Sequence, residues 1–323
     1  MNRRETLGAI TGAAAAAALG WGGSVAAQGK TAVVLGTATP GGGFPVYGAA
    51  FSETINETDG SLDVQPKNTK GSTENVPLLE EGKLDLGQAT GEVTYEAIAG
   101  IGQAPVKNVR ILSAMYSQSG MFVVRADGPY KTIAELKGKP VAWGAKGSGL
   151  VVLARYVIDG LGLDMNKDFE AIYLDKAADG PAMVLDGRAA ALWGGGVGWP
   201  GFVAVAKGPA GARFIPPSAD EVKRIAAKHT FLKPITLPAG SYPGQDAAVP
   251  SIGSWAFVLA RASLPDDTAY RLARALHKGE GLIGTKLAQA KESTLANTVA
   301  AAPRPDLIHP GVQKYLREIG LVR

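Results

Sequence analysis

Three glycine-bearing segments carry the residues best suited to bind a ligand. Each lies between a β-rich run and a helical pattern, and they read Gly41-Gly42-Gly43-Phe44, Gly71-Ser72-Thr73-Glu74 and Gly147-Ser148-Gly149. Glycine allows backbone N–H groups to approach a ligand closely, and the start of a helix adds partial positive charge. A segment of this kind can hold an anion without a buried lysine. Because the carboxyl ends of parallel strands face one crevice, the three segments predict one site for a small anion.

Each segment alone also fits an ordinary structural role. Glycine and serine are common where helices begin, so Ser72 and Ser148 fit either helix N-caps or direct ligand donors. These segments contain neither the Gly-Lys-Ser/Thr ending of a Walker loop nor the G-x-G-x-x-G spacing of a dinucleotide site. The prediction of an anion site therefore depends on the three segments acting together, and no cofactor is expected.

A fourth glycine segment, residues 194–198, lies between two tryptophans. We expect Gly195 and one of the flanking tryptophans to line the ligand site, and assign Trp199 to it, because pockets favour aromatic side chains. Trp143 and Trp255 lie inside strand patterns and are predicted to be core residues. Arg125 ends a predicted strand, where it fits either a bidentate partner of a carboxylate or a solvated charge.

These segments lie in a chain along which strand and helix patterns alternate. Predicted strands cover residues 32–36, 62–66, 84–88, 110–116, 121–125, 140–144, 170–174, 189–193 and 251–259. Predicted helices cover residues 46–57, 73–81, 91–99, 133–137, 178–185, 265–283 and 311–320, and another opens at 147–149 and runs to about 161. Residues 239–249 and 300–310 are expected to be surface connections. Such alternation favours an α/β fold with helices on both faces of parallel sheets.

Composition narrows the class of protein further. The chain has 323 residues, which favours two lobes, and no cysteine, which excludes disulfides and thiolate sites. Its formal net charge is only +4, and the charges are scattered, so nucleic-acid binding has no support and a monomer is expected. The uncharged stretch 189–206 contains too many glycines and a proline to be a membrane-spanning helix.

The N-terminus is typical of an export signal. Arg3 and Arg4 precede an Ala/Gly-rich apolar stretch, and small residues follow up to residue 27. The apolar stretch is shorter than the roughly 20 residues that a membrane anchor needs. The paired arginines followed by Leu7 are similar to a twin-arginine signal, although Asn2 and Thr6 depart from the usual residues. We therefore expect residues 1–27 to direct the chain to the periplasm.

Several motifs, found in order along nearly the whole mature chain, resemble the TAXI family of TRAP-transporter solute receptors. The most specific are GSTEN at 71–75, YPGQD at 242–246 and HPG at 309–311. The resemblance implies a type II periplasmic-binding-protein fold, with two α/β lobes joined by two crossover strands around a ligand cleft. It places the crossovers near residues 121–127 and 249–259. Lobe 1 would comprise residues 28–127 and 250–323, and lobe 2 residues 128–249.

The resemblance also implies a function. A TAXI receptor captures a small carboxylate, such as a dicarboxylate or an amino acid, and delivers it to a TRAP-type permease. Carried over by position, the binding residues lie in segments 41–44, 71–74, 147–149 and 195–200. The first segment departs from the family, because Gly43, Phe44 and Pro45 replace residues with hydroxyl groups. The departure puts glutamate in doubt as the ligand and makes a less polar acid plausible.

Other readings of the chain remain open. Gln88 and Glu92 fall where the family's pocket floor is expected, but a capping pair explains them equally well. The three histidines have no metal-ligand spacing and are expected to be structural. An enzyme on the same fold is an alternative, although no nucleophile elbow or acid–base pair is evident in the sequence. A sensor subunit for a membrane receptor kinase is the other alternative.

Overall fold

The computed structural model describes residues 29–323, so the predicted export signal lies outside the described residues. The strands are β1 (Thr31–Gly36), β2 (Leu62–Lys67), β3 (Leu86–Thr90), β4 (Val109–Arg125), β5 (Pro140–Ala145), β6 (Glu170–Leu174), β7 (Ala191–Gly195), β8 (Ala212–Ile215), β9 (Lys233–Leu237) and β10 (Val249–Arg261). The helices are α1 (Gly43–Thr58), α2 (Ser72–Glu80), α3 (Gly91–Ala99), α4 (Gly149–Gly160), α5 (Asp179–Leu185), α6 (Pro200–Ala206), α7 (Ala219–Lys228), α8 (Asp266–Lys278), α9 (Glu280–Lys286), α10 (Leu295–Ala301) and α11 (Pro310–Glu318). Short 3-10 helices are η1 (Ala134–Leu136), η2 (Ala288–Glu292) and η3 (Pro305–Leu307).

All these strands form one hydrogen-bonded network. Its order is β2-β1-β3-β10-β4-β7-β5-β6, with β8 paired to β4 and β9 paired to β10. The pairs that β1 forms with β2 and β3, and β5 with β6 and β7, are parallel. Helices connect these parallel strands, as crossover connections require. The predicted α/β class is therefore confirmed.

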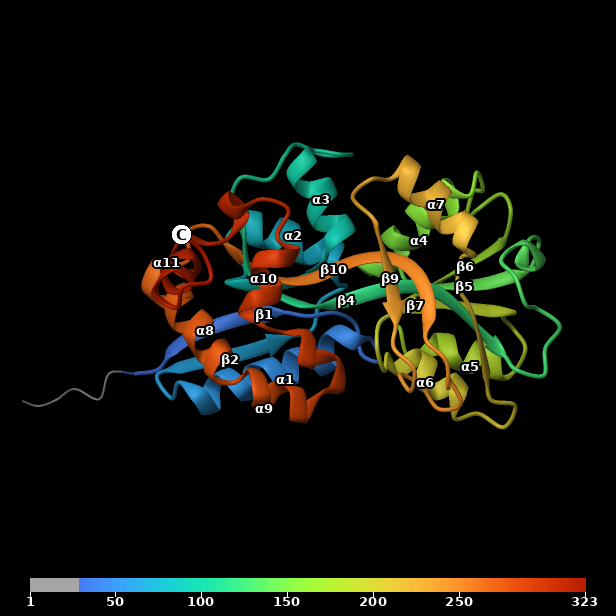
Figure 1. Ribbon diagram of the computed structural model, residues 1–323, viewed down its shortest axis with the longest axis horizontal. Coiled ribbons are helices and arrows are strands. Elements are labelled where there is room, and N and C mark those ends of the chain that lie inside the picture. The colour runs from blue at the N-terminus through green and yellow to red at the C-terminus, as the bar shows by residue number, and fades with distance from the viewer. Residues whose placement is uncertain (1–28) are drawn as a thin grey trace, which may run out of the picture.

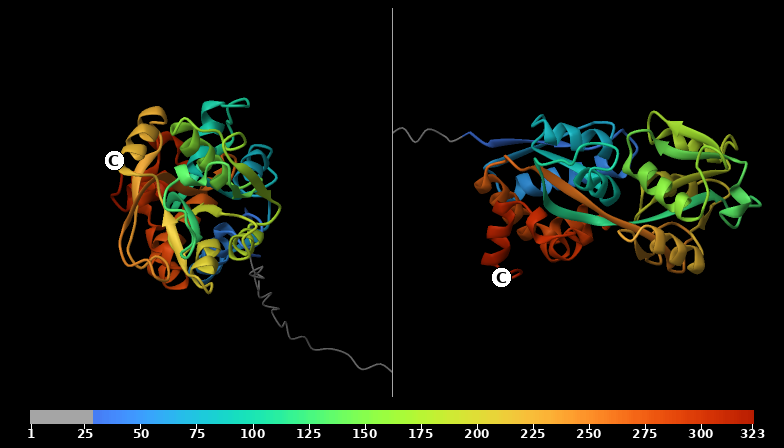
Figure 2. Two further views of the ribbon diagram at one scale, coloured as in Figure 1. Left: turned by 90° about the vertical axis from the view of Figure 1, so that its right-hand side faces the viewer. Right: turned by 90° about the horizontal axis from the view of Figure 1, so that it is seen from above.

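The buried apolar side chains fall into two parts of the chain. One cluster contains residues between Met121 and Ile252, and two others contain residues between Val33 and Tyr116 and between Ala256 and Leu316. We call the part around the first cluster lobe 2 and the part around the other two lobe 1. Figure 1 shows lobe 1 at the left and lobe 2 at the right, and the view from above in Figure 2 shows the same elongated arrangement.

Two long antiparallel strands connect the lobes. β4 and β10 pair from Gly120 with Ile252 to Val109 with Arg261, and they run side by side across the middle of Figure 1. β4 is one continuous strand, so the prediction of separate strands at 110–116 and 121–125 was wrong. The polar residues 117–120 interrupt the apolar pattern but not the backbone pairing, because β10 pairs with them throughout.

Two other predictions need correction, and three elements were not predicted. The helix predicted at 265–283 is two helices, α8 and α9, which meet at Gly279. The helix predicted from residue 46 begins at Gly43, one turn earlier. Residues 212–237, for which no element was predicted, form β8, α7 and β9, with Ser218 and Glu221 as a capping box at the start of α7.

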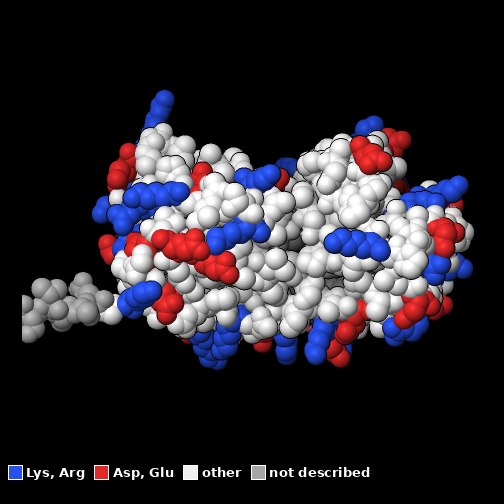
Figure 3. Space-filling model, turned by 90° about the horizontal axis from the view of Figure 1, so that it is seen from below, with Lys and Arg blue, Asp and Glu red and all other residues white. Residues whose placement is uncertain are grey.

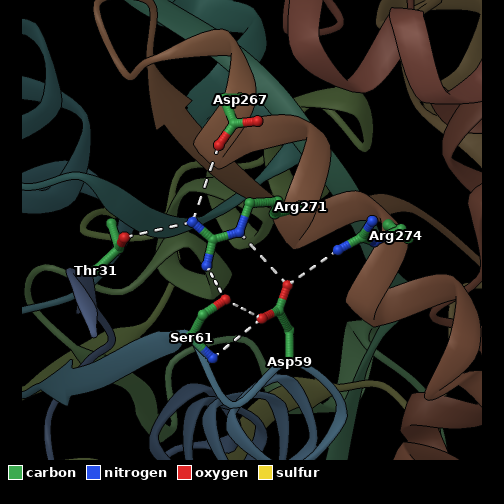
Figure 4. Close-up of polar contacts among 6 residues, drawn as sticks. All are labelled: Thr31, Asp59, Ser61, Asp267, Arg271 and Arg274. Atoms are coloured by element: carbon green, nitrogen blue, oxygen red, sulfur yellow. Dashed lines mark hydrogen bonds and ion pairs between the residues drawn. The ribbon is translucent and has the colours of Figure 1, made fainter. Parts of the chain in front are cut away.

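A half-buried polar cluster connects α8 to other elements of lobe 1. Asp59, at the end of α1, accepts hydrogen bonds from Ser61 and from the guanidinium groups of Arg271 and Arg274 (Figure 4). Arg271 also donates to Thr31 on β1, at 3.4 Å. The cluster therefore connects the N-terminal stretch of lobe 1, which contains Thr31 and Asp59, to its C-terminal stretch, which contains α8. Within residues 29–323, no helix is long and apolar enough to cross a membrane.

Candidate ligand-binding cleft

A cavity lies between the lobes and is lined by residues of both. Lobe 1 contributes Gly42, Gly43, Phe44, Gly71, Ser72, Thr90 and Tyr116, and lobe 2 contributes Trp143, Ser148, Gly149, Leu150, Trp193 and Trp199. Its volume is about 40 Å³, whereas a single water needs roughly 10–15 Å³. Charged side chains of both signs are interspersed on the face seen in Figure 3, as the scattered charges of the sequence predicted.

Lobe 1 directs two helix N-termini at the cavity. Gly42 is the N-cap of α1 and Gly71 the N-cap of α2, and neither helix has a side-chain cap. Gly71 has a φ of 116°, a conformation that favours glycine. Ser72 is therefore the first residue of α2 rather than its N-cap, and its Oγ accepts a hydrogen bond from the Thr90 N–H at 3.2 Å.

Lobe 2 directs the N-terminus of α4 at the same cavity. Ser148 is the N-cap of α4, and its Oγ accepts a hydrogen bond from the Leu150 N–H at 3.2 Å. The first N–H groups of a helix have no partner within that helix. The N-termini of α1, α2 and α4 therefore add partial positive charge from both lobes to one small space.

Aromatic side chains form much of the remaining wall. Trp193 and Trp199 both line the cavity, where one was expected. Trp143 is buried in the lobe 2 core, as predicted, but it lines the cavity as well. Its Nε1 has no hydrogen-bond partner in the described part of the chain, whereas Nε1 of Trp193 donates to the Leu150 carbonyl at 2.8 Å. Trp255 packs in lobe 1 instead.

Five of the predicted site residues do not line the cavity. Gly41, Thr73 and Gly147 lie where the lobes touch: a Cβ on Gly41 would meet Ala178, and a Cβ on Gly147 would meet Lys70. Thr73 donates from its Oγ1 to the Gly147 carbonyl at 3.1 Å. Glu74 accepts a hydrogen bond from the Lys70 N–H, and Gly195 packs against the Ser119 carbonyl. Gly41, Thr73 and Gly147 therefore belong to the contact between the lobes.

The other polar candidates also lie outside the cavity wall. Arg125 is half-exposed and pairs with Asp127 at 2.7 Å, which matches the solvated-charge alternative. Gln88 and Glu92 are fully buried, and Glu92 accepts a hydrogen bond from Ser254 at 2.6 Å. Burial raises the pKa of Glu92. Of the histidines, His309 caps α11 by accepting from the Gly311 N–H.

The sequence did not single out several residues that line the cavity. Thr90 ends β3, Tyr116 and Gln118 lie in the middle of β4, and Lys70 precedes Gly71. Thr90 Oγ1 and Gln118 Oε1 are buried without a hydrogen-bond partner. Position at the carboxyl end of a predicted strand could have identified Thr90. Only the continuity of β4 brings Tyr116 and Gln118 to the cavity.

A second contact between the lobes lies beside the cavity, where α3 faces α4. Glu96 on α3 pairs with Arg155 on α4 and accepts a hydrogen bond from the Tyr156 hydroxyl at 2.7 Å. The rings of Tyr95 and Phe231 stack with their centroids 4.2 Å apart. Together with the bond from Thr73 to Gly147, these contacts hold the lobes against one another around the cavity.

Solved structures with this fold include periplasmic binding proteins. MatC from Rhodopseudomonas palustris, solved with bound malate, matches with a TM-score of 0.56 and 15% identity over 90% of this chain and 96% of that chain. The periplasmic binding protein BugD matches with a TM-score of 0.57 and 13% identity over 89% and 95%. The alkanesulfonate-binding protein SsuA from Xanthomonas axonopodis pv. citri, bound to MOPS, matches with a TM-score of 0.50 and 17% identity over 90% and 84%.

A protein-family model also matches most of the chain. The model of the NMT1-like family covers residues 35–320, which include all the strands except the start of β1 and all the helices that form the cleft. The narrower resemblance to TAXI receptors remains a prediction. The chain belongs to the NMT1-like family.

Proposed function

We propose that this chain is a periplasmic solute-binding protein that captures a small organic anion between its lobes and delivers it to a membrane transporter. The observation that carries the proposal is the convergence of three helix N-termini, from both lobes, on one cavity. Such ends bind anions through backbone N–H groups and the helix dipole. Gly42, Gly43, Phe44, Gly71, Ser72, Ser148, Gly149 and Trp199 would contact the ligand, and the contact between the lobes would form as they close.

The TAXI resemblance adds finer expectations to this proposal. They are a TRAP-type permease as partner, export through residues 1–27, and dicarboxylates and amino-acid-like carboxylates as the first ligands to test. We propose the division between the lobes near residues 127 and 250, with hinges at 121–127 and 249–259, where β4 and β10 cross from one lobe to the other. No chemical step is assigned to the cavity residues, since the proposed role is capture and release.

The proposal predicts stabilisation by organic anions. The chain without residues 1–27 should unfold at a higher temperature with its ligand, because a ligand at 100 times its dissociation constant stabilises a protein by about 2.7 kcal/mol. A thermal-shift screen of carboxylates and sulfonates measures this effect, and small-angle scattering should show compaction with any hit. A screen in which no organic anion raises the unfolding temperature would contradict the proposal, as would turnover of the bound acid.

A pair of tryptophan variants tests whether the cavity donors contact the ligand. Trp143→Phe should weaken anion binding about 5- to 10-fold, the usual worth of one hydrogen bond at about 1 kcal/mol, and change stability little. The reason is that Nε1 of Trp143 has no hydrogen-bond partner among residues 29–323, so only the bond to the ligand is lost. Calorimetric titration and urea unfolding measure the two quantities.

Trp193→Phe is the matched control, because Trp193 is equally buried and also lines the cavity. Its Nε1 already donates to the Leu150 carbonyl. This variant should lose about 1 kcal/mol of stability and keep most of its affinity. Equal losses of affinity in the two variants would show that Trp143 acts through packing alone.

A further inference from the structure

The walls of the cavity carry a charge pattern that restricts the ligand. Among residues 29–323, Lys70 is the only one with a charged side chain that lines the cavity, and no aspartate or glutamate of this range lines it. The nearby carboxyl groups are otherwise engaged: Glu74 accepts from the Lys70 N–H, and Glu92 is buried against Ser254. A ligand ammonium group would lose its water in the closed cleft and gain no carboxylate partner. The cavity therefore disfavours amino acids.

The same walls are rich in aromatic rings. Trp143, Trp193 and Trp199 come from lobe 2, and Tyr116 and Phe44 come from lobe 1. Trp199 reaches the start of α1, since a Cβ on Gly43 would lie 3.2 Å from its ring. Rings thus lie directly beside a helix N-terminus that can hold an anion. A second carboxylate on the ligand would find only the exposed Lys70 as a charged side-chain partner and would otherwise be desolvated against these apolar faces.

We infer that the ligand is a monovalent organic acid with a flat aromatic body and no ammonium group. This inference rests on the proposed function and narrows its ligand class. The acid group binds at the N-termini of α1, α2 and α4, and the ring packs against Trp199 and its aromatic neighbours. The cavity of about 40 Å³ admits the ring only when these side chains shift to enlarge it. Edge-to-face and offset packing of rings favours this arrangement. It departs from the dicarboxylates and amino acids that the TAXI resemblance implies.

Three acids of related shape test the inference by calorimetric titration. 3-Phenylpropanoate has the ring and one negative charge, L-phenylalanine adds an ammonium group to the same skeleton, and glutarate replaces the ring by a second carboxylate. The first should bind at least tenfold more tightly than either of the others. L-Phenylalanine or glutarate binding as tightly as 3-phenylpropanoate would overturn the inference and leave the proposed function standing. Failure of these and all other organic acids to bind would overturn both.

A variant of the aromatic wall gives an independent readout. Trp199→Leu should weaken 3-phenylpropanoate binding at least tenfold and leave the binding of propanoate, which has no ring, within about threefold. Trp255→Leu should leave both affinities unchanged, because Trp255 is half-buried against the core of lobe 1 and does not line the cavity. Equal weakening of both acids by Trp199→Leu would show that Trp199 positions the anion site rather than the ring, and would contradict the inference.

Discussion

Gly149→Ala should abolish ligand binding while both lobes stay folded. A Cβ at this position would lie 2.7 Å from Ser72 Oγ and 2.5 Å from Thr90 Cγ2, and closer still to Thr90 Oγ1. Rotating the Thr90 side chain does not relieve the overlap, because both of its branches are involved. Gly149 belongs to lobe 2 and the two obstructing residues to lobe 1, so the overlap disappears when the lobes separate. Alanine also favours a helix over glycine, so α4 itself should not be harmed.

The expected loss of affinity is at least 100-fold, measured by calorimetric titration. Small-angle scattering should show no compaction with ligand, and the unfolding temperature of the free protein should not fall. Gly281→Ala is the control, because Gly281 lies in α9 and a Cβ there would have no heavy atom within 4 Å. Binding by Gly149→Ala within threefold of the original protein would show that the liganded cleft is more open than this structure.

Much of the fold could be predicted because its buried elements carry clear patterns. The strand predicted at 140–144 is β5 but for one residue, and all of β5 except Pro140 is buried. The helix at 91–99 has the predicted bounds and buries Val93 and Ala97. The missed elements β8, α7 and β9 bury little apolar surface. Ile225 is the only buried residue of α7, and β8 and β9 each have one buried residue, at the end of the strand. Periodic burial is the main sequence signal for an element, so β8 and β9 gave almost none. The spacing of Ser218 and Glu221 does mark the start of α7 in the sequence, and the prediction missed it.

The candidate site could be predicted only in part, for a different reason. The glycine segments mark the right helix starts, but glycine has two uses there that look alike in sequence. Gly43 leaves room beside Trp199 in the cavity, whereas Gly147 leaves room for the Lys70 backbone where the lobes touch. Separating the two uses requires knowing which residues the opposite lobe presents. Trp143 illustrates the same limit, since a strand pattern identifies a core residue but not that it also faces the cleft.

Asp59→Ala should destabilise lobe 1 by about 2 kcal/mol, because it leaves two guanidinium groups without their shared carboxylate partner. The Asp59 side chain is only 12% exposed and accepts from Ser61, Arg271 and Arg274 (Figure 4). Urea unfolding of the free protein measures the loss. Asp127→Ala is the control and should leave the stability nearly unchanged, since Asp127 is 55% exposed in its pair with Arg125 and water and salt screen such exposed pairs.

The pH dependence of this loss identifies its origin. Burial alone would raise the pKa of Asp59, but the hydrogen bonds from Ser61 and Arg271 and the charge of Arg271 lower it below its usual value. A carboxyl group with a lowered pKa in the folded state stabilises the protein above its unfolded pKa, which is about 3.9 for aspartate. That stabilisation is lost as the pH falls through the folded pKa. The difference in unfolding free energy between the original protein and Asp59→Ala should therefore stay constant from pH 7 to about pH 5 and shrink below about pH 4. A difference that persists undiminished at about pH 2.5 would assign the loss to packing around Asp59 rather than to its charge.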